Sequence, residues 1–503
     1  MTRRPAFALS LVAALAACVG LPAGVERTPT YALSGTADTT LGQALAPFLA
    51  AHPGENGFYL LEQGADAFLA RLALARAAQR TLDLQYYIFR PDDTGAALLG
   101  AALAAADRGV RVRLLLDDMA APGWGGALAA LDAHPNLEIR LFNPFAHRGA
   151  RWLDFVTDFA RVNRRMHNKS MTADSQLSIV GGRNVGDEYF AARPDLDFSD
   201  LDVLAAGPVV REVAGAFDAY WNSDAAWPLA AFGAAADPLE LARLRGRFSE
   251  HGREQSASAY ARVLRDTDLA NAIRTGSLPA YWGRASVIAD SPAKVTAPPE
   301  DRSTHAILKL GKLLQGANRE LILVSPYFVP GKEGVQWLRQ MAARGVRVRV
   351  LTNSFAATDV RVVHAGYAAY RRELLESGIE LYELKPTAAV AKRTLHGSSR
   401  ASLHAKAYMT DRRALFVGSL NLDPRSVELN TEMGVVLESE PLCRSLAERF
   451  DQRILDLAWR LQLDGDRLVW ATRDARTDQE PEMGLLQGMV QGLLRLLPLE
   501  EQL

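Results

Sequence analysis

A chain of 503 residues is longer than one hydrophobic core usually supports, so we expect two domains, or three. Apolar residues make up 49% of the sequence and charged residues 23%, as in an ordinary globular protein, which excludes disorder for the bulk of the chain. The formal net charge is −1 at pH 7, so no overall basic field draws the molecule to nucleic acid or anionic lipid, and any phosphate recognition must rest on local clusters.

The chain opens with a segment that has the organisation of a secretory signal. Two arginines precede an apolar stretch from Ala6 to Leu15, which at roughly a dozen apolar residues is too short to span a bilayer. It ends in Leu-Ala-Ala-Cys18, which resembles a bacterial lipobox. We interpret residues 1–18 as a lipoprotein-type signal segment that ends at the lipidated Cys18. The alternatives are an ordinary signal peptide with an incidental cysteine and an uncleaved N-terminal anchor.

This interpretation places the protein at a bacterial membrane, lipid-anchored in the periplasm. The anchor would lie in the outer or the inner membrane, and the hydrophobic Val19 favours the outer one. The other cysteine, Cys443, has no partner pattern for a metal site. We expect no disulfide bond between the two, because Cys18 belongs to the targeting segment.

Two stretches of the chain repeat one another at long range. Arg108–Arg113 and Arg344–Arg349 both read Arg-Gly-Val-Arg-Val-Arg. Each copy follows a predicted helix, and each helix follows a predicted apolar strand; the helices are 98–107 and 335–343, and the strands are 82–89 and 321–328. This alternation predicts α/β units with mixed, largely parallel buried sheets.

The domain organisation follows from this duplication. We expect an N-terminal α/β domain with its linker over residues 40–290 and a C-terminal α/β domain over 291–478. The polar stretch 232–302 is interpreted as an irregular connection with some helix around 256–273. Residues 479–503 form an amphipathic segment, for which core packing and membrane docking are both open.

A short polar motif occurs at the same depth in each half. His167 follows Arg108 by 59 residues and His404 follows Arg344 by 60, and each histidine begins a His-x-Lys-x4-Asp pattern. The pattern predicts a strand with His and Lys on one face, followed by Asp at a turn. The remaining members are Lys169 and Asp174 in the first copy and Lys406 and Asp411 in the second. A second strand then ends in Gly-Gly-Arg-Asn184 or in Gly-Ser419-Leu-Asn421.

Brought together, the two copies supply what phosphodiester exchange needs without a metal or another cofactor. One imidazole attacks phosphorus to form a phosphohistidine, and the other donates a proton to the leaving oxygen. Lys169 and Lys406 neutralise the non-bridging oxygens, and Asn184, Asn421 and Ser419 bind the phosphate. We expect a carboxylate behind each histidine, and Asp200 and Glu432 are the candidates.

Other kinds of site have little support in the sequence. Lysine is not a zinc ligand, and there is no His-Glu-x-x-His pattern or cysteine pair. The glycines after Val180 do not form the Gly-x-Gly-x-x-Gly pattern of dinucleotide sites, and no Gly-x-Ser-x-Gly elbow of serine hydrolases occurs.

The double His-x-Lys-x4-Asp pattern, with Gly-Gly/Ser-x-Asn after each copy, resembles the phospholipase D superfamily. The flanking sequence is similar to the bacterial cardiolipin synthase C branch, from about residue 55 to the C-terminus. The clearest matching stretches are Leu84–Ile88, Phe142–Phe145, Arg164–Ser170, Ser325–Pro330 and Asp423–Glu432.

This resemblance implies two α/β sandwich halves related by a pseudo-twofold axis, with one site between them. It implies His167 as the nucleophile, His404 as the acid and base, and Asp174 and Asp411 as structural supports. The implied reaction transfers a phosphatidyl group from phosphatidylglycerol or phosphatidylethanolamine onto phosphatidylglycerol, giving cardiolipin. The expected partners are therefore phospholipids and a membrane surface. The lipobox-like N-terminus departs from the family's usual location at the cytoplasmic face.

Several alternatives remain open at this point. Water could intercept the phosphohistidine, which would make the enzyme a phospholipase D or a nuclease, although the near-neutral net charge argues against nucleic acid. An inactive lipid-binding scaffold is opposed by the completeness of both motifs. Five arginines before the first motif either contact headgroups or form a solvated face, and three aromatic residues among them are either buried or lie in the membrane interface. These are Arg148, Arg151, Arg161, Arg164 and Arg165, with Trp152, Phe155 and Phe159. The resemblance also allows His364 a place in the headgroup pocket.

Overall fold

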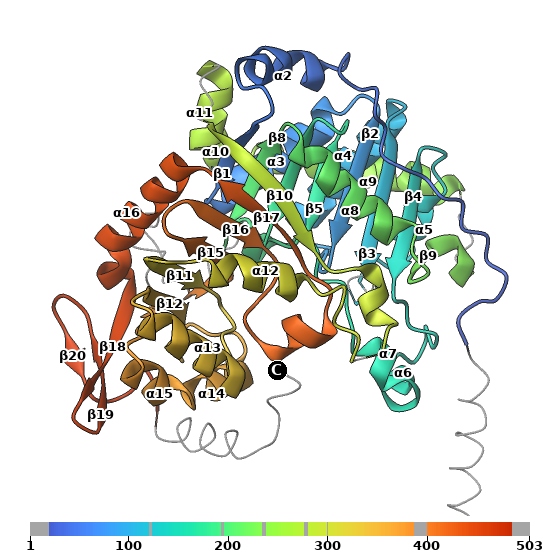
Figure 1. Ribbon diagram of the computed structural model, residues 1–503. Helices are drawn as coiled ribbons and strands as arrows, with labels where there is room; N and C mark the ends of the chain where they lie inside the picture. The colour runs from blue at the N-terminus through green and yellow to red at the C-terminus, as the bar shows by residue number, and fades with distance from the viewer. Residues whose placement is uncertain are drawn as a thin grey trace, which may run out of the picture.

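The computed structural model describes residues 20–119, 123–192, 196–233, 238–275, 280–298, 300–386 and 400–484 (Figure 1). The expected signal segment with Cys18 lies outside the described residues. So do residues 485–503, which make up most of the expected amphipathic segment.

The first half is built on a mixed sheet with helices on both faces. From one edge, the strand order is β9–β4–β3–β2–β5–β6–β8–β1. The strands are β1 (Asn56–Leu61), β2 (Thr81–Tyr86), β3 (Arg111–Asp117), β4 (Leu137–Phe142), β5 (Ser170–Ala173), β6 (Leu177–Gly181), β8 (Asp202–Ala206) and β9 (Ala226–Pro228). The helices are α2 (Thr40–Ala51), α3 (Gly64–Ala77), α4 (Asp93–Asp107), α5 (Ala127–Asp132), α6 (Trp152–Thr157), α7 (Phe159–Val162) and α8 (Val209–Trp221).

The second half repeats this order, β18–β13–β12–β11–β15–β16–β17–β10, with β19 and β20 added outside β18. The strands are β10 (Tyr281–Ala289), β11 (Glu320–Val324), β12 (Arg347–Asn353), β13 (Glu380–Leu384), β15 (Lys406–Thr410), β16 (Ala414–Gly418), β17 (Met433–Glu438), β18 (Ala458–Asp464), β19 (Arg467–Ala471) and β20 (Arg476–Thr477). The helices are α12 (Ala306–Gln315), α13 (Gly331–Ala343), α14 (Arg361–Ala368), α15 (Arg371–Glu376) and α16 (Glu440–Leu457). The predicted duplicated α/β fold is therefore confirmed.

The repeated Arg-Gly-Val-Arg-Val-Arg stretches connect a helix to a strand in both halves. Gly109 follows α4 with φ 91°, and Gly345 follows α13 with φ 86°. Glycine adopts this left-handed conformation without the steric cost that a side chain adds, so the chain turns sharply out of the helix. The Val-Arg-Val run then enters the buried strands β3 and β12.

The sheets are mixed as expected, but they contain less parallel pairing than we predicted. Parallel pairing within them is confined to β2–β3–β4 and β11–β12–β13, which helical crossovers connect. The motif strands instead form tight hairpins, β5–β6 and β15–β16, whose turns place Asp174 and Asp411 at positive φ. Three residues separate the paired strands in each hairpin, and so short a turn joins antiparallel strands. The motif itself therefore makes the sheet antiparallel on that side.

The connection between the halves is more regular than its polar sequence suggests. It contains the helices α9 (Pro238–Ser256), α10 (Ala259–Arg265) and α11 (Asp268–Thr275) and then the long strand β10. β10 pairs with β17 along six residues and with β1 along three, so it joins both sheets into one (Figure 1). Although it lies before residue 290, β10 is thus the edge strand of the second half.

Each half has its own core, and a third core lies between them. One cluster packs α3 and α4 on the first sheet, and another packs α12 and α13 on the second. The third contains Phe58, Val180 and Val203 of the first sheet, Val417 and Val435 of the second, and buried side chains of α8 and α16. The two halves are therefore packed against one another through apolar side chains, and the motifs lie at one end of this contact.

Candidate active site

The motif histidines lie just before their strands rather than within them. β5 begins at Ser170 and β15 at Lys406, so the strand predicted to start at each histidine is shorter than expected. The reason is that the backbone there pairs with the other half. His167 N donates to Thr431 O at 2.8 Å, and His404 N donates to Ser199 O at 2.8 Å.

This pairing brings each histidine to the carboxylate of the opposite half. Thr431 directly precedes Glu432, and His167 Nδ1 lies 2.9 Å from Glu432 Oε2. Ser199 directly precedes Asp200, and His404 Nδ1 lies 2.6 Å from Asp200 Oδ2. The two predicted carboxylates are thus next to the histidines, but across the halves and not within them. Both carboxylates are buried.

Short cross-half pairings hold this arrangement. A two-stranded parallel sheet joins β7 (Leu196–Ser199) to β14 (Arg400–Leu403), directly before His404. On the other side, Met166 and Thr431 form a parallel bridge, and Thr431 N donates to Arg165 O at 2.9 Å. Backbone pairing between the halves therefore places each histidine next to its carboxylate.

The two motif lysines lie beside the histidines. Lys169 Nζ donates to His167 O and Lys406 Nζ to His404 O, each at 2.5 Å. Both side chains are buried, and burial lowers the pKa of each, in Lys169 to well below its ordinary value. The site is a buried group of basic side chains, so an anionic ligand would favour their charged forms.

The pKa values of the two histidine–carboxylate pairs are shifted differently. Burial holds the pKa of His167 well below its ordinary value, and Lys169 and Lys406 lower it further. Burial also raises the pKa of its partner Glu432 to about 7. The pKa of Asp200 is lowered instead: burial would raise it, but the neighbouring His404 and Lys406 outweigh this effect. Burial lowers the pKa of His404 too, while the anionic Asp200 opposes that shift. His404 therefore faces the more firmly ionised carboxylate.

The three predicted phosphate-binding side chains do not all face one space. Asn421 lines a cavity together with both histidines, and its Oδ1 has no hydrogen-bond partner within the described chain. Asn184 lines the same cavity but is already bonded, with Nδ2 donating to the Tyr189 hydroxyl and Oδ1 accepting from Ile88 N. Ser419 does not line the cavity; its hydroxyl donates to Glu432 Oε2 at 2.5 Å. Ser419 thus contacts the carboxylate behind His167, because the Gly-Ser end of β16 lies against Glu432.

The motif aspartates lie away from the cavity, at the hairpin turns. Asp174 accepts hydrogen bonds from the backbone N–H groups of residues 79, 80 and 81, directly before β2. Asp411 accepts the equivalent bonds from residues 318, 319 and 320, directly before β11. Their geometry is that of structural supports for the turns.

The cavity between the halves has a volume of about 410 Å³. Besides the histidines and asparagines it is lined by tyrosines and arginines from both halves, among them Tyr87, Tyr189, Arg90 and Arg425. The Tyr87 ring lies edge-on to His167 with centroids 5.0 Å apart, and the Tyr189 ring lies likewise 5.4 Å from His404. Both rings come from the first half, so one half supplies an aromatic wall to each of the two histidines. Sequence reasoning did not single out these tyrosines.

Sequence reasoning also missed three buried carboxyl groups around the site. Asp117 Oδ2 accepts from Met166 N at 2.8 Å, and Asp290 Oδ2 accepts from Glu432 N at 2.7 Å. Asp117 therefore fixes Met166, the residue before His167, and Asp290 fixes Glu432, the carboxylate that faces His167. Asp423 lines the cavity itself, and burial raises its pKa to about 7. Asp423 and Glu432 both lie in the stretch Asp423–Glu432, which is similar to the cardiolipin synthase C branch. That similarity was the only feature of the sequence that could have pointed to Asp423.

Comparisons with known proteins bear on this geometry. A family model described as "Cardiolipin synthase, PLD-like domain" matches residues 72–221 and 310–454, more than half of the chain and one copy in each half. The chain belongs to this phospholipase D-like family. The resemblance noted in the sequence is thereby confirmed.

Relatives within the family match along most of the chain. Cardiolipin synthase C of Escherichia coli K12 is 44% identical over 476 residues, which cover 92% of this chain and 99% of the relative. Cardiolipin synthase B of the same strain is 26% identical, over 79% of this chain and 80% of the relative. Among solved structures, the phosphatidylserine synthase of Haemophilus influenzae Rd KW20 matches 91% of this chain and 97% of its own, with a TM-score of 0.57 and 13% identity. At that identity the likeness concerns the fold alone.

The arginines before the first motif form ion pairs and hydrogen bonds within the protein. Arg148 and Arg151 pair with the buried Asp118, and Arg161 pairs with Asp158. The two that follow donate to backbone carbonyls, Arg164 to Lys294 O and Ala297 O and Arg165 to Asn143 O. Three aromatic residues among them are exposed instead of buried: Trp152, Phe155 and Phe159.

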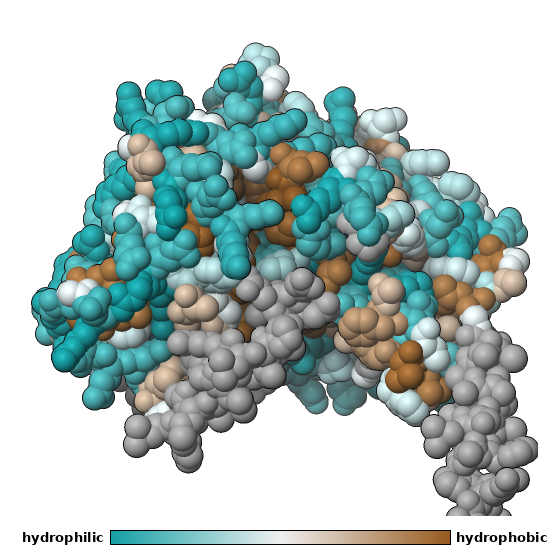
Figure 2. Space-filling view, turned by 60° about the horizontal axis from the view of Figure 1, so that its bottom comes forward, coloured by the Kyte–Doolittle hydropathy of each residue, from teal (hydrophilic) through white to brown (hydrophobic). Residues whose placement is uncertain are grey.

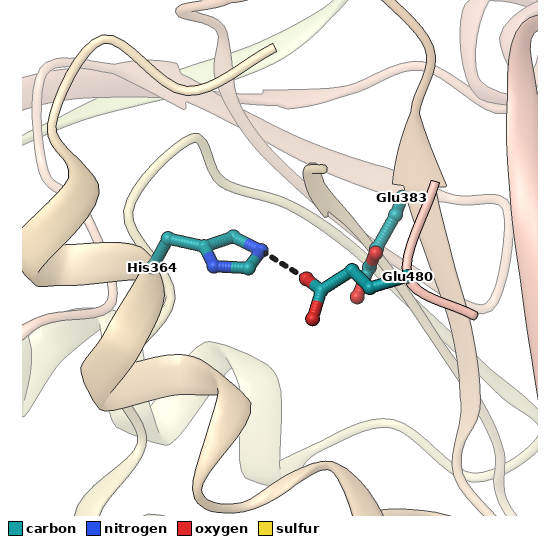
Figure 3. Close-up of side chains that lie close together, drawn as sticks. All are labelled: His364, Glu383 and Glu480. Carbon is teal, nitrogen blue, oxygen red and sulfur yellow. Dashed lines mark ion pairs between the residues drawn. The ribbon is translucent and has the colours of Figure 1, made fainter. Parts of the chain in front are cut away.

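His364 lies in a buried polar cluster and not among the residues that line the cavity (Figure 3). The Arg371 guanidinium lies in this cluster, with Nη2 3.0 Å from His364 Nε2, 2.7 Å from Glu480 Oε1 and 2.8 Å from Glu383 Oε1. Three potential metal ligands meet there, His364, Glu383 and Glu480. The guanidinium bonds to the same atoms that a cation would need, so the residues fit an ion-pair cluster. It fastens residue 480, near the end of the described chain, to α14 and α15.

Proposed function

We propose that this chain is a phosphatidyltransferase that forms cardiolipin from phosphatidylglycerol and a second phospholipid through a phosphohistidine intermediate. The observation that carries the proposal is the pair of buried histidines, each backed by a carboxylate from the opposite half, on one cavity with two lysines beside them. Membership in the phospholipase D-like family and the relatedness to cardiolipin synthases C and B support the same reaction.

In the first step, His167 Nε2 attacks the phosphorus of the donor lipid. A nitrogen–phosphorus bond forms, the bond to the headgroup oxygen breaks, and His404 gives its proton to that oxygen. The pKa directions support this assignment of roles. Burial and the lysines lower the pKa of His167, which favours the neutral form that a nucleophile needs. Burial also lowers the pKa of His404, but the neighbouring Asp200, whose own pKa is lowered, opposes that shift and favours a proton on His404.

In the second step, a hydroxyl of the acceptor phosphatidylglycerol displaces His167. His404, now neutral, accepts the hydroxyl proton, a new phosphorus–oxygen bond forms, and the nitrogen–phosphorus bond breaks. Lys169 and Lys406 stabilise the charge on the non-bridging oxygens in both steps, and Asn421 and Asn184 contact the phosphate. Glu432 holds the Nδ1 proton of His167 and stabilises the positive charge that develops on its ring. Asp174 and Asp411 act only through the turns that they support.

The test supplies labelled phosphatidylglycerol to the enzyme, with and without phosphatidylethanolamine. We expect cardiolipin as the product. Formation of phosphatidic acid alone would instead establish a hydrolase, because water would then have taken the place of the acceptor. His167→Ala and His404→Ala should each abolish turnover. His251→Ala, which changes a partly buried histidine on α9 that does not line the cavity, serves as the matched control.

The same reaction can test the roles of the two histidines. Stopping turnover in acid-free conditions and mapping the phosphorylated peptide should place the phosphoryl group on His167. A stable phosphohistidine at His404 in the unaltered enzyme would reverse the assignment.

We also propose that the protein works at a membrane surface, anchored in the periplasm through a lipid on Cys18. The supporting observations are the lipobox-like ending of the signal segment and the lipid substrates of the proposed reaction. None of the helices in the described part of the chain has both the length and the apolar composition needed to cross a bilayer. Mass spectrometry of the mature N-terminus should find an acylated Cys18, and an unmodified chain that begins elsewhere would disprove the anchor.

A further inference from the structure

Two short helices before the first motif expose an apolar surface. α6 and α7 carry Trp152, Phe155, Val156 and Phe159, whose exposed fractions are 64%, 40%, 74% and 48%. We call these four residues the aromatic patch. In the part of the chain that the structure describes, no other stretch of eight residues exposes four large hydrophobic side chains. Exposing such a contiguous apolar cluster to water is unfavourable in free energy, which indicates that the cluster is a contact surface.

The aromatic patch lies beside the cavity. Directly after α7, Asn163 accepts hydrogen bonds from Arg425, with Nη2 2.8 Å from its carbonyl oxygen, and Arg425 lines the cavity. His167 follows four residues later. Figure 2 views the molecule from the side on which α6 and α7 project, and hydrophobic side chains gather over these helices at its lower right.

Contacts with the rest of the first half hold α6 and the residue before it in place, so the aromatic patch projects from an ordered part of the protein. Asp154 of α6 accepts from His147 N at 2.9 Å, and the Phe155 ring packs on Phe145 with centroids 5.6 Å apart. Arg151 Nη2 lies 3.0 Å from the buried Asp118. The exposed side chains thus do not need a protein partner to order the helices beneath them.

We propose that the aromatic patch inserts into the interfacial region of a phospholipid bilayer and so holds the mouth of the cavity against the headgroups. This inference rests on the proposed function, because a lipid substrate must reach the cavity from a membrane. A volume of about 410 Å³ accommodates a headgroup and its phosphate, whereas the two acyl chains must remain outside.

A bilayer explains the patch better than a second protein. A stable protein interface takes roughly 20–30 residues from each partner, and four side chains on two short helices fall well below that. Tryptophan and phenylalanine above partly exposed arginines are the composition of interfacial membrane contacts. Arg148 and Arg151 supply such guanidinium groups at the base of the patch, with side chains 31% and 22% exposed.

The test places an environment-sensitive fluorophore on the full chain through Val156→Cys, and on a matched control through Ile273→Cys. Ile273 is 55% exposed on α11, at the other end of the molecule (Figure 1). The unsubstituted chain gives the labelling background of its own cysteines, of which Cys443 is buried. With vesicles of phosphatidylglycerol and phosphatidylethanolamine, we expect a blue shift and brightening at position 156 and no change at position 273.

An unchanged probe at position 156, or an equal change at both positions, would overturn the proposal. So would a shift at position 156 without vesicles that grows with protein concentration, because a second copy of the chain would then cover the patch. This readout needs no turnover, so it remains informative even if the proposed reaction is wrong.

Activity provides a second, independent readout. The triple variant Trp152→Ser, Val156→Ser, Phe159→Ser should lose activity on vesicles by roughly tenfold or more, and should keep its activity on dispersed short-chain phosphatidylglycerol. Ile273→Ser should retain both activities. Equal loss on both substrates would contradict a membrane role for the patch, whereas no cardiolipin from any form of the enzyme would count against the proposed function instead.

Discussion

At the scale of single residues, the most informative contrast lies between the supports of the two carboxylates. Glu432 has the Ser419 hydroxyl on its Oε2, whereas the equivalent position next to Asp200 is Gly182. A Cβ at position 182 would overlap the Asp200 carboxylate, so no serine fits there. The two histidine–carboxylate pairs therefore differ chemically. His167 faces a glutamate that accepts a serine hydroxyl, whereas His404 faces an aspartate that has no such hydroxyl at the equivalent position.

Removing the Ser419 hydroxyl should move the pH dependence of turnover. Its hydrogen bond favours the ionised form of Glu432 and so lowers the pKa of that carboxyl, which burial raises to about 7. Since the ionised form assists His167, activity should rise with pH through about 7. In Ser419→Ala this rise should occur at higher pH, with activity regained in alkaline buffer.

A pH–rate profile of kcat checks this expectation. Ser178→Ala removes a buried hydroxyl on β6 that is bonded to Thr172 on β5, and it should leave the midpoint unchanged. A Ser419→Ala profile that falls uniformly at every pH would contradict the assigned link between Ser419 and Glu432.

At the scale of elements, the two hairpin turns support the motif strands through hydrogen bonds from backbone N–H groups to Asp174 and Asp411. Asp174→Ala leaves three N–H groups without an acceptor, and we expect the free energy of unfolding to fall by about 2–4 kcal/mol. Asp411→Ala should cost less, about 1 kcal/mol, because water reaches that turn. Urea denaturation of both variants measures the difference, and equal losses would show that burial does not set the cost.

Much at this scale could be predicted from the sequence. The repeated Arg-Gly-Val-Arg-Val-Arg stretches indicated the correct helix–strand order, and the predicted helix 98–107 lies within α4. The strand register around the histidines could not be predicted, because His167 and His404 bond to the backbone of the opposite half and no local pattern encodes that partner. The two carboxylates were therefore identified as residues, while their exchange between the halves was missed.

The long strand β10 was missed for a related reason. Its sequence, from Tyr281 to Ala289, follows a polar and helical connection. Only its two partners, β1 and β17, reveal it as the strand that joins the sheets of the two halves. Ser419 was assigned to the phosphate from its place after Gly418, but the distance that matters, to Glu432, depends on packing around β17. Local pattern thus predicted the elements, whereas contacts between distant elements decided the details of the site.

At the scale of the whole molecule, several buried carboxyl groups should make stability depend on pH. Burial raises the pKa of Asp117 and Asp290 to about 6, and of Asp423 and Glu432 to about 7. Unfolded carboxyl groups titrate near pH 4, so between pH 4 and 7 the folded protein holds protons that the unfolded chain releases. The stability that these groups contribute is complete below about pH 4 and is lost as the pH rises through 7.

The free energy of unfolding should therefore be lower at pH 8 than at pH 6.5, by up to about 1.4 kcal/mol for each unit by which a pKa is raised. Denaturation curves at pH 5, 6.5 and 8 measure this slope. Asp423→Asn should flatten it, and Asp478→Asn, which changes an exposed carboxyl, should not.

The lowered pKa of Asp200 acts below this range. The lowered pKa values of His167, His404 and His305 oppose the effect below about pH 6.5, where the imidazoles of the unfolded chain are protonated, so the slope between pH 6.5 and 8 isolates the carboxyl groups. A protein that becomes more stable from pH 6.5 to 8 would contradict the prediction.

The exchange of carboxylates between the halves has a consequence for how the chain is made. His167 is synthesised 265 residues before Glu432, which at the pace of a ribosome is roughly 15–50 s. Asp200, although made early, serves a histidine that emerges 204 residues later. A nascent chain thus holds an incomplete candidate site until most of its length has been synthesised. A chain that ends before the second motif therefore lacks both histidine–carboxylate pairs.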